Sequence, residues 1–167
     1  MIHVYYGNGK GKTTAALGLA IRAAGHGRSV FIVQFLKNSL TGEEESLSKF
    51  PNIKILRGKV GGFTMTKEEK AGTTEIHNSN LKCACESVFG GKCDLLILDE
   101  GMDALRKGLL DEEMLRKLVF SCPDIELVIT GHKPVDWLID AADYVTEMVK
   151  IKHPFDKGVT ARPGIEY

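Results

Sequence analysis

The stretch Gly7-Asn8-Gly9-Lys10-Gly11-Lys12-Thr13-Thr14 follows an apolar run over Ile2–Tyr6 and leads directly into an apolar helical pattern. In this strand–turn–helix setting, backbone N–H groups of a glycine-rich turn and a helix N-terminus converge on phosphate oxygens. Lys12 is then expected to reach a β- or γ-phosphate and the hydroxyl of Thr13 to ligate magnesium, while Lys10 adds a second positive charge. The stretch therefore predicts a phosphate-binding site.

The spacing of this turn is one residue shorter than usual. The pattern G-x-x-x-x-G-K-T requires glycine at position 6, where this chain has Tyr6, and the first glycine is Gly7. Phosphate binding is thus predicted, whereas the orientation of a bound nucleotide is not. The alternative is a turn that only links strand to helix, and the order Gly-Lys-Thr-Thr at such a junction argues against it.

A second polar feature follows the apolar run Leu95–Leu98, which ends in Asp99-Glu100. Carboxylates at the carboxyl end of a buried strand lie where open α/β sheets bind their ligands. We expect Asp99 or Glu100 to hold magnesium directly or through water, and Glu100 is also suited to orient a water molecule. The alternative is that both carboxylates merely begin the next helix.

Short apolar runs alternate with longer helical patterns, which is typical of βαβ units. The sequence therefore predicts an α/β fold in three layers with a mainly parallel sheet of about six strands. The expected strands are Ile2–Tyr6, Ser29–Phe35, Ile53–Leu56, Asp94–Asp99, Leu127–Thr130 and Asp143–Ile151, the last at an edge. The expected helices are 13–25, Lys67–Phe89 and Asp111–Phe120, with a polar loop over 36–45 and a tail, 153–167, of little regular pattern.

The chain has 167 residues, which fits a single domain over 1–167. Its 22 Lys and Arg balance 22 Asp and Glu, so it lacks the basic excess of a nucleic-acid-binding protein. No apolar run approaches the roughly 18 residues of a membrane span, and no signal peptide is evident, so we expect no membrane association and a cytoplasmic location. The four cysteines, Cys83, Cys85, Cys93 and Cys122, are interpreted as core or helix residues rather than disulfides or zinc ligands.

Several stretches of this chain resemble the ATP:corrinoid adenosyltransferases built on a P-loop core. They are GNGKGKTTAALGLAIRAAGHG (7–27), QFLK (34–37) with Gly42-Glu43 after it, DLLILDE (94–100), LVITG (127–131) and VTEMVKIKHPFDKGVTARPGIEY (145–167). The resemblance spans nearly the whole chain, and the short glycine spacing is a family trait. It implies a RecA-like P-loop NTPase fold and a homodimer. The implied reaction moves the 5′-deoxyadenosyl group of ATP to the cobalt of a reduced corrinoid and releases triphosphate.

The resemblance also implies which residues serve this reaction. Those expected to bind ATP are Gly7, Asn8, Gly9, Lys10, Gly11, Lys12, Thr13 and Thr14. Arg22 either contacts the nucleotide or forms a structural salt bridge, and Mg²⁺ or Mn²⁺ is expected on Thr13 and on Asp99 or Glu100. Lys10 and Lys12 would stabilise the triphosphate leaving group. Because cobalt(I) is itself the nucleophile, the reaction requires no protein base.

The resemblance implies that the loop over residues 61–65 contacts the corrinoid. In the family the order Phe-Thr-Trp places an aromatic pair beside the corrin, where it displaces the lower axial ligand of cobalt. Phe63 matches this pattern and is expected to act in catalysis, whereas Met65 replaces the tryptophan with an apolar, adaptable side chain. The alternative for Phe63 is a loop aromatic that closes the core.

Two histidines near the expected site, His132 and His153, are expected to have different roles. His132 follows Thr130-Gly131 where the family has arginine, so a permanent positive charge near the phosphates is replaced by a titratable one. This exchange is expected to weaken ATP binding unless His132 is protonated. We interpret His153 as a residue that orders the tail or completes the dimer rather than as a cobalt ligand.

Two other functions remain compatible with these motifs: a P-loop ATPase or nucleotide kinase, and a non-catalytic, ATP-gated corrinoid-binding protein. The resemblance also allows an electron-donating flavoprotein reductase as a partner. Longer family members carry an N-terminal extension that covers the nucleotide, whereas the first strand here begins at Ile2. We therefore expect either a more open site or another segment that closes it.

Overall fold

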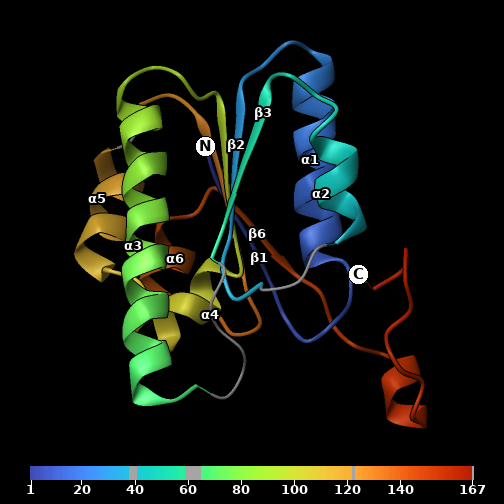
Figure 1. The fold of residues 1–167 in the computed structure, drawn as a ribbon. Helices are drawn as coiled ribbons and strands as arrows, with labels where there is room; N and C mark the ends of the chain where they lie inside the picture. The colour runs from blue at the N-terminus through green and yellow to red at the C-terminus, as the bar shows by residue number, and fades with distance from the viewer. Residues whose placement is uncertain (38–40, 59–64, 122, 167) are drawn as a thin grey trace.

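The computed structural model describes residues 1–37, 41–58, 65–121 and 123–166, and in them a six-stranded parallel sheet lies between two layers of helices (Figure 1). The strand order is β3-β2-β4-β5-β1-β6. The strands are β1 Ile2–Tyr6, β2 Val30–Gln34, β3 Ile53–Arg57, β4 Leu95–Asp99, β5 Glu126–Thr130 and β6 Tyr144–Glu147. The helices are α1 Lys12–Gly25, α2 Gly42–Leu47, α3 Lys67–Phe89, α4 Gly101–Arg106, α5 Glu112–Ser121 and α6 Asp136–Ala141, followed by the 3₁₀ helix η1 Pro154–Lys157.

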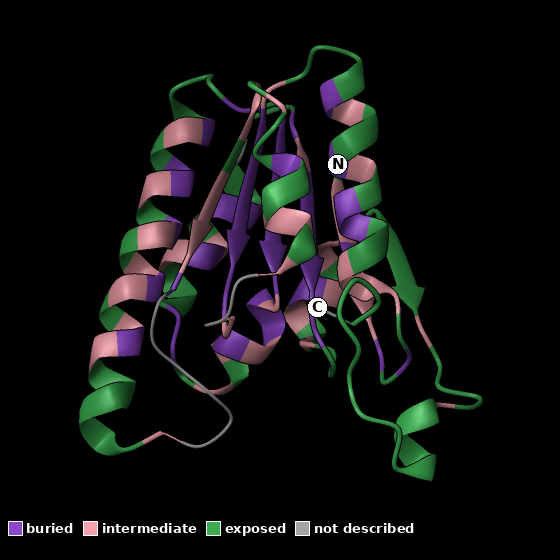
Figure 2. Cartoon of the chain, turned by 45° about the vertical axis from the view of Figure 1, so that its right-hand side comes forward, coloured by how far each residue is buried: buried purple, intermediate pink, exposed green. Residues whose placement is uncertain are grey.

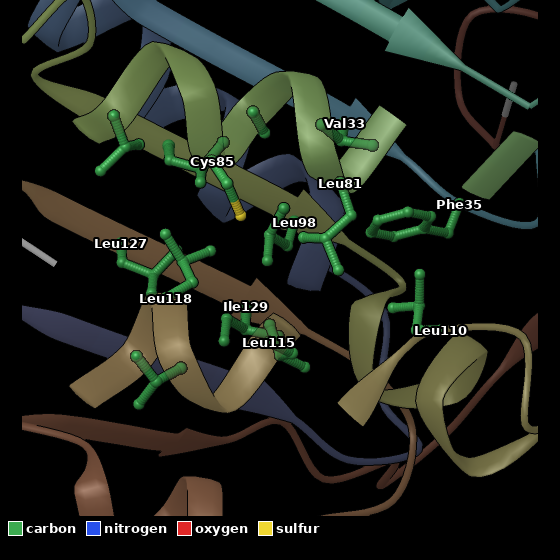
Figure 3. Close-up of a cluster of buried hydrophobic side chains, with 14 of the residues drawn as sticks. Val33, Phe35, Leu81, Cys85, Leu98, Leu110, Leu115, Leu118, Leu127 and Ile129 are labelled. Carbon is green, nitrogen blue, oxygen red and sulfur yellow. The ribbon is translucent and has the colours of Figure 1, made fainter. Parts of the chain in front are cut away.

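The two faces of the sheet carry separate hydrophobic clusters. Helices α1 and α2 cover one face, on which Ile32 and Ile97 lie, whereas α3, α4, α5 and α6 cover the other (Figure 1). Figure 3 shows part of the second cluster, where Leu98 of β4 and Ile129 of β5 meet Leu81 of α3. Strands β2 and β4 are buried along their whole length, as Figure 2 shows, because helices cover both of their faces.

The predicted fold class is confirmed, and the sheet is parallel in every pairing of the described strands. The expected helix over Lys67–Phe89 has these bounds, since a capping box between Thr66 and Glu69 fixes its start. The polar loop expected over 36–45 was wrong in part, because α2 begins at Gly42. Like α4, α6 and η1, α2 has too few residues to show a helical period in the sequence.

The last strand is shorter than expected, ending at Glu147 rather than Ile151. The reason is its partner, because β1 ends at Tyr6 and the glycine-rich turn begins there. Past that point Met148 bonds to the turn instead: its N–H donates to the carbonyl of Tyr6 (2.7 Å) and its carbonyl accepts from the N–H of Gly9 (2.7 Å). The end of β6 therefore packs directly on the turn.

This packing requires glycine at two positions of the turn. A Cβ added to Gly7 would lie 2.3 Å from the carbonyl oxygen of Met148, and one added to Gly9 would lie 2.7 Å from the same atom. Gly7 also has a φ of 115°, and Gly11 a φ of 116°, which side-chain-bearing residues rarely adopt. The close approach of Met148 thus accounts for glycine at positions 7 and 9, and the positive φ accounts for glycine at position 11.

Replacing Gly9 by alanine is expected to lower the free energy of unfolding by about 1–3 kcal/mol, because backbone has to move to relieve the contact with Met148. Urea unfolding followed by circular dichroism measures this loss. Gly25→Ala is the matched control, since a Cβ there meets nothing within 4 Å. Equal midpoints for Gly9→Ala and Gly25→Ala would contradict the steric explanation.

His77 of α3 is a buried histidine beneath the end of β3. Its two ring nitrogens have no hydrogen-bond partner within the described parts of the chain, and its ring lies edge-on to Phe35 with centroids 5.1 Å apart. Burial lowers the pKa of His77 to about 4. The native protein therefore keeps this imidazole neutral at pH values where the unfolded chain protonates it.

We expect the stability to fall as the pH is lowered from about 6.5 to about 4, because in this window the unfolded state takes up a proton that native His77 does not. His77→Leu removes that proton uptake. Between about pH 7.5 and pH 4, wild type should lose about 2–3 kcal/mol more free energy of unfolding than His77→Leu. Urea titrations across this range test the point, and parallel pH profiles for the two proteins would contradict it.

Candidate functional site

A cleft of about 820 Å³ opens at the carboxyl ends of β1, β4 and β5. The glycine-rich turn and the first half of α1 form one wall, and α2 forms another. The start of α4, the loop after β5 and the segment Gly164–Glu166 complete the lining. A cleft at this edge of a parallel sheet is where open α/β folds bind ligands.

The buried carboxylate of Asp99 lies beneath this cleft at the end of β4. Its Oδ1 accepts hydrogen bonds from the hydroxyls of Thr13 (2.8 Å) and Thr130 (2.8 Å). Its Oδ2 accepts from Nε2 of Gln34 (3.2 Å) and pairs with the ammonium of Lys37 (2.9 Å). A buried charge is tolerated only when it is paired and hydrogen-bonded, and four donors meet that requirement here.

Glu100, the next residue, lines the cleft. Its backbone is left-handed, with φ at 57°, and its N–H donates to the hydroxyl of Thr130 (2.9 Å). Burial, and then the negative charge of Asp99, raise the pKa of the Glu100 carboxyl to about 7. A cation beside this carboxyl would favour its ionised form.

Three lysines among the described residues line the cleft, and each is held by an acceptor of the chain. The ammonium of Lys12 donates to the carbonyl of Gly9 (2.7 Å), and burial lowers its pKa. That of Lys37 lies between Asp99 and Glu43, 3.5 Å from Oε1 of the latter. Lys10 reaches across the cleft mouth to the carbonyl of Ile165 (2.8 Å).

The described structure brings most of the expected ATP-binding residues together. Those that line the cleft are Asn8, Gly9, Lys10, Gly11, Lys12, Thr13 and Thr14, joined by Glu100. The N–H of Gly7 donates to the carbonyl of His132 (3.2 Å) and that of Gly9 to Met148, so both hold the turn in place. The side-chain oxygen of Asn8 accepts from the N–H of Lys150 (2.8 Å), which adds a second contact of the turn with the segment after β6.

The remaining expected residues lie elsewhere. Arg22 is exposed on α1 outside the cleft lining, and within the described chain it forms no salt bridge. Met65 packs against the cluster beneath α3, and its sulfur accepts from the hydroxyl of Thr73 (3.5 Å). Phe63 and Thr64, like Cys122, fall outside the described residues.

His132 and His153 both line the cleft. Nδ1 of His132 lies 3.0 Å from Oδ2 of Asp103, which also accepts from the backbone N–H of His132 (2.8 Å). Nδ1 of His153 accepts from the N–H of Phe155 (3.2 Å) and so caps η1. This contact agrees with the interpretation that His153 orders the tail.

Sequence reasoning missed Lys37, Glu43, Asp103 and Thr130 as lining residues. Lys37 and Thr130 each follow or end an apolar strand, the same signal that identified Asp99 and Glu100. Glu43 and Asp103 lie on the short helices α2 and α4, which gave no periodic pattern. Their proximity depends on packing between elements distant in sequence.

The residues at the cleft floor fit a divalent cation held partly by a polyphosphate. Mg²⁺ is typically bound by one or two protein oxygens together with phosphate oxygens and water. Because the Thr13 hydroxyl donates its proton to Asp99, its lone pairs remain available, and the Glu100 carboxyl lines the same cleft. Within the described ranges there is no cluster of three or more His, Cys, Asp or Glu suited to a metal, and none of the helices there is long and apolar enough to cross a bilayer.

The fold and the cleft define a three-layer α/β protein with a polar ligand site at the carboxyl edge of its sheet. The chain belongs to the family of enzymes described as ATP:corrinoid adenosyltransferase BtuR/CobO/CobP, whose model matches residues 1–167. This membership favours adenosyl transfer over the ATPase, kinase and non-catalytic alternatives.

Curated relatives support the same family. A corrinoid adenosyltransferase of Pseudomonas aeruginosa is 34% identical over 98% of this chain and 82% of its own length. Corrinoid adenosyltransferases of Escherichia coli K12 (34%) and Salmonella typhimurium (35%, CobA) each match 100% of this chain and 85% of their own length. The similarity therefore includes the glycine-rich turn, the strand end at Asp99 and the tail.

Proposed function

We propose that this protein transfers the 5′-deoxyadenosyl group of ATP to the cobalt(I) of a reduced corrinoid and releases triphosphate. The observation that carries the proposal is the convergence of Lys10, Lys12, the Thr13–Asp99 hydrogen bond and Glu100 in one cleft of a chain from this family. In this reaction a cobalt–carbon bond forms at C5′ while the bond between C5′ and the triphosphate oxygen breaks. Cobalt supplies the electron pair, and triphosphate leaves with its charge.

In this reaction the protein then acts by stabilising the negative charge of the leaving triphosphate. Positive groups placed where the leaving charge develops lower the barrier more than they would in water, because they are already oriented. In this proposal Lys12 and Lys10 contact the triphosphate, residues 8–14 form the cradle around it, and Gly7 holds the turn in place. No side chain has to remove a proton, which fits a cleft whose functional groups are mainly cations and metal-binding oxygens.

We assign a divalent metal, Mg²⁺ or Mn²⁺, to Thr13 and Glu100, where it would neutralise part of the triphosphate charge. Asp99 already accepts from Thr13, Thr130, Gln34 and Lys37, so in this assignment it positions Thr13 and reaches the metal through water. Arg22 is given no nucleotide contact here, since it lies outside the cleft lining.

On the corrinoid side we retain Phe63 as the residue that packs on the corrin face and Met65 as its apolar neighbour. Support comes from the family-matched Phe-Thr order and from Met65, which the core cluster and Thr73 hold at the start of α3.

Three broader features complete the proposal: a single domain over 1–167, a homodimer and a cytoplasmic location with a flavoprotein reductase as electron donor. Support for the dimer is the edge strand β6, all four residues of which are exposed. Apolar side chains continue beyond it, with Ile151 at 83% and Phe155 at 74% exposure. A second copy of the chain would remove this surface from water.

Lys12→Ala is expected to lower adenosylcobalamin formation by about 100-fold or more, because a cation of the turn is lost where the negative charge of triphosphate develops. The assay combines purified protein, ATP, Mg²⁺ and chemically reduced cobalamin, and it quantifies adenosylcobalamin and triphosphate together. Lys54→Gln, on β3 and outside the cleft lining, is the matched control and should retain activity. Release of ADP and phosphate by wild type, in place of triphosphate, would overturn the proposed reaction.

Phe63→Ala is expected to leave the Kd for ATP within about twofold while turnover with cobalamin falls by about fivefold, as loss of an aromatic contact of roughly 1 kcal/mol implies. Isothermal titration calorimetry gives the first quantity and the adenosylation assay the second. If Phe63→Ala and Lys12→Ala lose ATP affinity equally, the two residues do not serve separate ligands.

A further inference from the structure

The segment Arg162–Glu166 lies at the mouth of the cleft and binds Lys10. Besides its bond to the carbonyl of Ile165, the ammonium of Lys10 pairs with Oε1 of Glu166 at 3.1 Å. Glu166 also accepts from Arg162 through the backbone N–H (2.8 Å), Nε (3.2 Å) and Nη2 (3.1 Å). One carboxylate is thus held between two cations, one of them on the glycine-rich turn.

The acceptor of Lys10 differs in kind from those of the other two cleft lysines. Lys12 is bound by the turn itself and Lys37 by the buried Asp99, so freeing either disturbs the core of the site. Glu166 belongs to a segment whose residues, Gly158–Glu166, are all exposed. Its departure from Lys10 would cost only exposed polar contacts, which are worth little in water.

A carboxylate oxygen and a phosphate oxygen are equivalent acceptors for an ammonium group. The hydrogen bonds from Arg162 hold the pKa of Glu166 at about 2, so the carboxylate is ionised throughout the physiological range. A polyphosphate that reaches Lys10 would then lie beside this carboxylate, and like charges at such distances repel. A polyphosphate would therefore compete with Glu166 for Lys10.

We propose that Glu166 is a determinant of nucleotide affinity: it occupies Lys10 in the nucleotide-free protein, and the polyphosphate of ATP displaces it. This inference rests on the proposed function only in assigning ATP to the cleft. It also gives a role to the segment 164–166, whose residues line the cleft.

The test is the binding of inorganic triphosphate and of Mg·ATP, measured by isothermal titration calorimetry at fixed low salt. Glu166→Gln keeps the shape of the side chain and removes its charge, so it should bind triphosphate about two- to fivefold more tightly than wild type. The matched control is Glu112→Gln, which removes one carboxylate from the exposed Glu112–Arg116 pair on α5 and should leave the Kd unchanged.

A double-mutant cycle with Lys10→Gln separates local competition from a change in overall charge. In the Lys10→Gln background, Glu166→Gln should produce no gain beyond that of Glu112→Gln. Unchanged or weaker binding by Glu166→Gln overturns the proposal, as does an equal gain without Lys10. Because triphosphate binding needs no corrinoid, these results are independent of the adenosylation assay, whose failure would bear on the reaction alone.

Discussion

The carboxylate of Asp99 is the constraint on which the rest of the site depends. It is fully buried, and burying an unpaired charge is too costly for a domain of this size to accommodate. Its four donors come from α1, β2, the residue stretch after β2, and β5. Satisfying one buried charge therefore fixes the start of α1, and with it the glycine-rich turn, against the central strands of the sheet.

A second constraint acts from the opposite side of the turn, where Met148 approaches Gly7 and Gly9 more closely than any Cβ would allow. The turn is thus held between a side-chain network beneath it and a backbone contact beside it. Its two lysines line the cleft, where the carbonyls of Ile165 and Gly9 hold them. For a reaction whose difficult charge is a departing triphosphate, cations in a rigid frame are what the chemistry requires.

Sequence patterns located the six strands and the helices with a clear period or cap, such as β4 and α3, and missed the helices of six residues or fewer. They also overextended β6, because pairing ends where the partner strand ends and not where alternation stops. For the site, the turn and Asp99-Glu100 could be predicted from local motifs. The partners of Lys37 and Glu166 could not, since the pairing of Lys37 with Asp99 and that of Glu166 with Lys10 join elements distant in sequence.

The amino-acid sequence by itself determined the α/β class, the glycine-rich turn and the family, because each depends on residue types at fixed short spacings. Tertiary structure decided how these parts work together. It made Asp99 the partner of Thr13 rather than an open ligand, left Glu100 facing the cleft with a raised pKa, and laid Glu166 on Lys10. Burial and contacts across 86 or 156 positions of chain set these properties, and local spacing carries no information about them.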